Sequence, residues 1–153
     1  MKLPRLIEQT LGPKRTPAPL AKVRVENLTR GNLVAASVEV AGDSASRRKG
    51  LLGHTALAPE EGLWIVPCES VHTIGMAFPI DLIYLDTSRK VRKLCRNVPA
   101  WRFSICLSAH SILELAAGTI ERTQVSVGDR LELLHLSTQQ PEAETSSPEV
   151  HND

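Results

Sequence analysis

Residues 80–98 read IDLIYLDTSRKVRKLCRNV. The apolar segment 80–85 is typical of a strand, the polar residues 86–88 of a turn, and residues 91–98 of a second strand that follows it. This stretch therefore predicts short strands joined by tight turns.

The same pattern recurs along the chain, while no strand-helix-strand rhythm and no internal repeat are visible. Strands are predicted at residues 23–28, 32–40, 63–66, 80–85, 91–98, 111–115 and 131–136. Short helices are predicted at residues 47–52, with an N-cap within residues 43–46 and a stop at Gly53, and at residues 119–124, with Thr119 as the cap. The pattern predicts a mostly β (α+β) single domain, with a curled antiparallel or barrel-like sheet of about seven short strands and two short helices.

The ends of the chain differ from its middle. A length of 153 residues suits one domain with a real core. Residues 1–21 contain four prolines and predict a flexible arm, and residues 137–153 have the composition of a disordered acidic tail. The folded domain is expected to span residues 22–136.

Charge and composition limit the partners. The 18 basic and 17 acidic residues nearly cancel, so no global field favours nucleic acid or an anionic membrane, and neither partner is expected. No apolar run is long enough for a signal peptide or a membrane span, which predicts a cytoplasmic protein. The three cysteines, Cys68, Cys95 and Cys106, are too few and odd in number for a disulfide framework.

Cys68, His72 and Met76 follow one another at intervals of four residues. This spacing is typical of the ligand loop of blue-copper proteins and therefore raises the hypothesis of a metal site. Such a site needs a second histidine, and His54 is poorly placed to supply it. Paired ligands at structural-zinc spacing are also missing. We therefore expect no cofactor and interpret Cys68 and Met76 as packing residues.

The acidic residues Asp81 and Glu114 each stand within an apolar predicted strand. By alternation they point away from their apolar neighbours, either to solvent or, if both sheet faces are covered, into a buried environment that requires a partner. His72 or Arg48 is a candidate partner, and Asp81 is also expected to accept hydrogen bonds from the backbone of residues 71–79.

Function is predicted from these polar residues and two tryptophans. The leading hypothesis is a small soluble domain that binds a polar small molecule or a protein segment near residues 72–81. The alternatives are a hydrolase-like or metal-dependent enzyme, with His72 as general base and Asp81 as its orienting group, and an adaptor that acts through its tails. No G-x-S-x-G or phosphate-loop signature favours catalysis. The candidate site residues are His72, Asp81, Trp64, Trp101, Arg102, Arg48 and Glu114.

Several fragments together resemble the bacterial and archaeal domain of unknown function family number 192. They are RKGLL at 48–52, GLW at 62–64, VHTIGMAFPID at 71–81, LD at 85–86, VP at 98–99, LELAAG at 113–118 and VGD at 127–129. The resemblance implies a compact, mostly β single domain and supplies no activity, cofactor or catalytic residue. Arg48 matches the family's recurrent arginine, and we consider it a partner for Glu114 or Asp129. Many members carry a secretion signal or lipoprotein anchor, a pattern from which this sequence departs.

Overall fold

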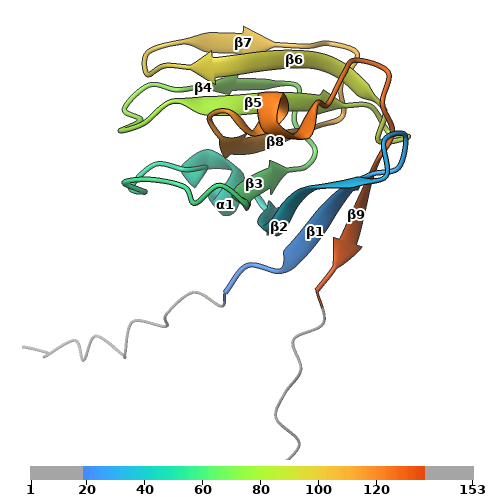
Figure 1. Ribbon diagram of the computed structural model, residues 1–153. Coiled ribbons are helices and arrows are strands. Elements are labelled where there is room, and N and C mark those ends of the chain that lie inside the picture. Colours follow the sequence, from blue (N-terminus) through green and yellow to red (C-terminus); the bar gives the residue numbers. More distant parts are fainter. Residues whose placement is uncertain (1–18, 137–153) are drawn as a thin grey trace, which may run out of the picture.

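The computed structural model describes residues 19–136, which form nine strands and two short helices (Figure 1). In chain order these are β1 (Lys22–Asn27), β2 (Asn32–Ala41), α1 (Ser44–Lys49), β3 (Glu61–Ile65), β4 (Ser70–His72), β5 (Ile80–Leu85), β6 (Val91–Val98), β7 (Phe103–Ile105), β8 (Ser111–Ala116), α2 (Thr119–Thr123) and β9 (Leu131–His135).

Seven strands form the main sheet, in the order β6-β5-β8-β3-β2-β1-β9. In Figure 1, β6, β5 and β8 lie above β3, and β2, β1 and β9 curl away below it, which gives a half-barrel. These are the seven strands that the sequence predicts, so the mostly β single-domain fold with two short helices is confirmed. The sheet is mixed rather than wholly antiparallel. The connection through α1 carries the chain from the end of β2 back to the middle of that strand, where Glu61 pairs with Ser37. The strand β3 therefore runs parallel to β2.

The strands β4 and β7 form a separate antiparallel ribbon that the sequence did not predict. Each has three residues, too few for apolar alternation to stand out. The ribbon covers part of one face of the main sheet, because Val71 of β4 packs into the apolar cluster on that face.

Both faces of the main sheet are buried. One face carries a cluster around Ile83, Leu113 and Ile120, and α2 covers it; the other carries a cluster around Leu82, Ile112 and Leu51. All six residues of β5 are therefore buried, as are five of the six in β8. Polar side chains on either strand are therefore almost entirely withdrawn from water.

The helix α1 begins at Ser44, three residues before the predicted start at residue 47, because the cap is Asp43, the first of the residues 43–46 in which it was expected. Asp43 accepts hydrogen bonds from the backbone N–H groups of Ala45 and Ser46 at 2.9 and 3.0 Å. The helix ends at Gly50, not at the predicted Gly53, because the chain turns there with φ of 49° and ψ of −135°, a conformation suited to glycine.

The predicted tail at residues 137–153, and all of the predicted arm at residues 1–21 except residues 19–21, lie outside the described residues. In the described part of the chain no helix is long and apolar enough to cross a membrane.

Candidate functional site

A cleft of about 530 Å³ lies between α1 and the ribbon strand β4. The end of α1 contributes residues 47–49 and the turn after it residues 50–52, while β4 contributes all three of its residues. Ile65 of β3 and Glu114 of β8 come from the main sheet and form the floor. The volume is in the range of about 300–1,000 Å³ that is typical of small-molecule sites.

Glu114 is the unusual residue of this cleft. It lies on β8 between Leu63 of β3 and Leu82 of β5, and its side chain shares their apolar face of the sheet. The residue is 5% exposed, and within residues 19–136 its Oε2 atom is buried without a hydrogen-bond partner. Burial raises the pKa of Glu114 to about 7, so the carboxyl group can gain or lose a proton near neutral pH.

Gly50, at the end of α1, lies directly beside this carboxylate. A Cβ atom at Gly50 would lie 3.9 Å from Oε2 of Glu114. Gly50, which has no side chain, therefore lies against Oε2 on the side of α1, and Oε2 itself is buried.

The other ionisable groups of the cleft lie around its rim. Arg47 donates to the Gly42 carbonyl at 2.8 Å, whereas Arg48, Lys49 and His72 are exposed. No ion pair joins any described cation to Glu114 within 4.0 Å. Burial raises the pKa of the Cys68 thiol, and the hydrogen bond from Cys68 Sγ to the Ser70 carbonyl at 3.1 Å opposes that rise. Glu114 therefore has no cation of its own among the described residues to neutralise it.

Asp81 is also buried, at 1% exposure, but both of its carboxylate oxygens accept hydrogen bonds from the backbone. Its Oδ1 accepts a hydrogen bond from the Asn97 backbone N–H and its Oδ2 one from Ile120 N–H, both at 2.8 Å. Asn97 lies in a bulge of β6 with φ of 49°, where a backbone N–H has no ladder partner. Ile120 N–H belongs to the first turn of α2, where helix N–H groups lack internal partners.

Two predictions about this region are therefore wrong. Asp81 does not bond the backbone of residues 71–79, since its donors are Asn97 and Ile120. Thr119 does not cap α2: the N-cap is Gly118, which has no side-chain bond. The carboxylate of Asp81 supplies an acceptor there from another strand.

The structure divides the predicted site residues into three groups. Arg48, His72 and Glu114 line the cleft together. Asp81 and Trp64 belong to the opposite face of the main sheet, where Trp64 packs against the α2-side cluster and the Arg89 guanidinium lies 5.7 Å from its ring centre. His72 and Asp81 therefore do not form a pair.

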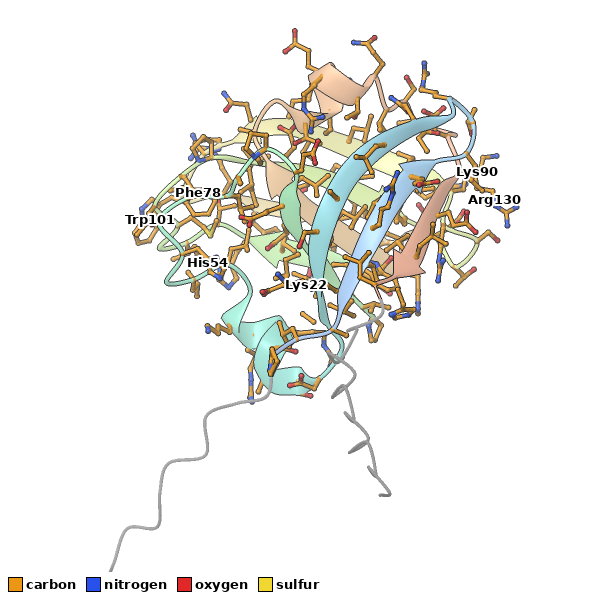
Figure 2. All side chains as sticks on the ribbon, turned by 60° about the horizontal axis from the view of Figure 1, so that its bottom comes forward. Lys22, His54, Phe78, Lys90, Trp101 and Arg130 are labelled. Carbon is orange, nitrogen blue, oxygen red and sulfur yellow. The ribbon has the colours of Figure 1, made fainter. Side chains whose placement is uncertain are left out.

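Trp101 and Arg102 form the third group, in the turn that leads into β7. Both are exposed, and Trp101 lies at the boundary of the molecule in Figure 2. Trp101 N–H donates to the Thr73 carbonyl at 3.1 Å, so the turn is tied to the end of β4, but neither residue lines the cleft.

Asp129 is not a partner of Arg48. Its Oδ2 atom accepts hydrogen bonds from Arg30 Nε at 2.6 Å, Asn27 Nδ2 at 2.8 Å and Ser126 N–H at 3.0 Å. This network joins the first hairpin to the turn before β9 and includes no residue of α1.

Cys68, His72 and Met76 all line the cleft. Among the described residues no group of three or more histidine, cysteine, aspartate and glutamate side chains is arranged to hold a metal ion.

Sequence comparison connects this geometry to known proteins. Residues 25–133 match the model of the family DUF192, described as "Uncharacterized ACR, COG1430". The chain belongs to the DUF192 family. The match covers the cleft and all of the main sheet except the first residues of β1 and the last residues of β9, and it confirms the resemblance seen in the sequence motifs.

Two curated proteins are similar to this DUF192 chain. A UPF0127 protein from Thermococcus sibiricus is 32% identical over 115 residues, which cover 69% of this chain and 71% of the relative. A UPF0127 protein from Pyrococcus furiosus is 34% identical over 113 residues, which cover 69% and 94%.

Two solved structures share the DUF192 fold. A "putative transcription regulator" from Sinorhizobium meliloti matches with a TM-score of 0.68 and 25% identity, covering 77% of this chain and 98% of that one. A protein of unknown function from Novosphingobium aromaticivorans matches with a TM-score of 0.60 and 23% identity, covering 72% and 83%.

Sequence reasoning missed two residues that shape the DUF192 cleft, Gly50 and Ser70. Gly50 stands in the RKGLL fragment, two residues after the arginine that the motif does single out. Ser70 has no such signal, because its place depends on the pairing of β4 with β7.

Proposed function

We propose that this domain binds a polar ligand, either a small molecule or a protein segment, in the cleft beside His72, and that Glu114 recognises it. The observation that supports this proposal is the buried, unpartnered Oε2 atom of Glu114 on the cleft floor, within the described part of the chain. An unsatisfied buried polar group is costly, and native structures contain few of them. A ligand that bonds this atom removes the cost.

The ligand group that fits Glu114 is a hydrogen-bond donor, and a cation fits best. A carboxylate accepts hydrogen bonds, and those from charged donors are the strongest. No described cation is within ion-pair distance of Glu114. A primary ammonium group at the floor of the cleft would therefore meet no cation from residues 19–136 already paired with Glu114, while Arg47, Arg48 and Lys49 line the cleft farther from it.

The structure does not favour the alternative of a hydrolase built on His72 and Asp81. A general base requires an orienting group within hydrogen-bond reach. Both carboxylate oxygens of Asp81 accept backbone hydrogen bonds, and the residue belongs to the opposite face of the sheet. We therefore assign the cleft to binding.

The test uses simple probes of one size and different charge: n-butylammonium, n-butanol and butyrate. We expect n-butylammonium to raise the melting temperature and to lower the pKa of Glu114, followed by NMR of its side-chain carboxyl carbon. Butanol should act weakly and butyrate not at all.

Two variants complete the experiment. Glu114→Gln should abolish the response to n-butylammonium, whereas Glu121→Gln, at an exposed position on α2, should leave it unchanged. Equal responses of Glu114→Gln and the unmodified protein, or a stronger response to butyrate than to n-butylammonium, would contradict the proposal.

A further inference from the structure

The ribbon strand β4 has a regular pattern of backbone hydrogen bonds to β7. Thr73 N–H donates to the Arg102 carbonyl, and Cys106 N–H donates to the Glu69 carbonyl, both at 2.9 Å. Val71 pairs with the residue of β7 midway between these two bonds. Since hydrogen-bonded and non-hydrogen-bonded pairs alternate in an antiparallel ladder, the backbone groups of Ser70 and His72 point away from β7.

The edge that carries these groups borders the cleft. The side chains of Ser70 and His72 lie on one face of the ribbon, and the side chain of Val71 lies on the other face. All three residues nevertheless line the cleft, and no residue of β7 lines it. The cleft therefore runs along the free edge of β4. Among these edge groups, the Ser70 carbonyl accepts the hydrogen bond from the Cys68 thiol.

The outer edge of β7 differs, because a side chain covers it. Lys93 of β6 donates from Nζ to the Ile105 carbonyl at 2.9 Å and to the Ser104 hydroxyl at 3.2 Å. A lysine placed in this way blocks the approach of another strand. Lys93 thus covers the outer edge of β7, whereas the edge of β4 at the cleft stays accessible.

From these observations we infer that the ligand is an extended peptide, which adds a strand to the free edge of β4 and places an ammonium group against Glu114. This inference rests on the proposed function and specifies its ligand. The three residues of β4 span about 10 Å, enough to pair with about three residues of a peptide. Backbone hydrogen bonds supply affinity in such strand addition, and a pocket for one group supplies specificity. Here that pocket is the floor around Glu114.

The ammonium group has two possible sources, a lysine side chain or a peptide amino terminus. Acetyl-Ala-Val-Lys-Val-Ala-amide carries only the lysine ammonium group. Gly-Val-Thr-Val-Ala-amide with a free amino terminus carries only the terminal ammonium group. Acetyl-Ala-Val-Gln-Val-Ala-amide carries neither and is the control. We expect one of the two charged peptides to bind more tightly than n-butylammonium by about tenfold or more. The backbone amide signals of Ser70 and His72 should shift in NMR spectra on binding.

A matched pair of variants tests the backbone contribution. Ser70→Pro removes the N–H that points into the cleft while leaving the bonds to β7 in place, a position where an edge strand tolerates proline. Ser70→Ala keeps that N–H. The peptide should lose its advantage over n-butylammonium with Ser70→Pro and keep it with Ser70→Ala.

The same loss should follow on the ligand side when the peptide nitrogens that face β4 are N-methylated, which leaves the protein unaltered. Binding of the peptide no tighter than that of n-butylammonium, and insensitive to N-methylation, overturns the strand-addition inference and leaves the proposed function standing. Failure of both the peptides and n-butylammonium to bind overturns both.

Discussion

Two buried carboxylates lie on neighbouring strands of one sheet, and the fold treats them in opposite ways. Asp81 of β5 lies opposite Leu115, while Glu114 of β8 lies opposite Leu82, so the offset of one residue places the two side chains on different faces. Asp81 accepts two backbone hydrogen bonds of 2.8 Å, and Glu114 Oε2 accepts none from the described residues. Burial alone therefore does not distinguish a carboxylate that supports the fold from one that binds a ligand. The distinction lies in whether hydrogen-bond donors of the protein surround the carboxylate.

The largest expected effect on the free energy of unfolding comes from removing the carboxylate of Asp81. Asp81→Ala leaves the N–H groups of Asn97 and Ile120 buried without an acceptor, and we expect a loss of about 4 kcal/mol in the free energy of unfolding. Chemical denaturation at neutral pH measures it. The bulge of β6 and the first turn of α2 should lose hydrogen-exchange protection first.

Asp81→Asn is the matched control. It retains one oxygen acceptor at nearly the same volume, so we expect about half the loss of Asp81→Ala. If both variants were as stable as the unmodified protein, Asp81 would not support the bulge and the helix, and its contrast with Glu114 would disappear.

The next effect is a pH dependence of stability that Glu114 introduces. Its pKa is raised from an ordinary value of 4.5 to about 7 by burial. Between these two values the folded protein binds more protons than the unfolded chain, so the free energy of unfolding falls as pH rises and levels off above the folded pKa. The total loss is about 3 kcal/mol, because a tenfold difference in proton affinity between the folded and unfolded states corresponds to about 1.4 kcal/mol.

Comparison with Glu114→Gln isolates this contribution from the titration of other groups. Denaturant midpoints are measured for both proteins between about pH 4 and pH 8. The amide cannot ionise, so the variant should be close to the unmodified protein at the acidic end and more stable by about 3 kcal/mol at the basic end. A constant difference across this range would mean that Glu114 is not desolvated.

The seven strands of the main sheet were predictable because each contains its own apolar pattern, as residues 80–85 do. The ribbon was not, and β7 shows the reason. Phe103 and Ile105 are exposed, at 69% and 45%, while Ser104 between them faces inward. A three-residue strand with its apolar side chains outward carries no signal of a buried face.

The site was predictable in its members but not in its arrangement. The sequence points to His72, Arg48 and Glu114, which do share a cleft, but it groups them with Asp81. That the two acids lie on opposite faces depends on the register of β5 against β8, which pairs residues far apart in the chain. Local alternation cannot supply that register.

The smallest expected effect tests whether Arg48 neutralises Glu114. Arg48 is exposed at the rim and no ion pair joins it to Glu114 within 4.0 Å, so Arg48→Ala should change the free energy of unfolding by less than about 0.5 kcal/mol at any pH. Arg30→Ala is the matched comparison. Arg30 bonds the nearly buried Asp129 at 2.6 Å, and its loss should cost about 1–2 kcal/mol. A loss of stability for Arg48→Ala that grew above pH 7 would identify this arginine as the missing partner, and Glu114 would then be satisfied within the chain, as Asp81 is.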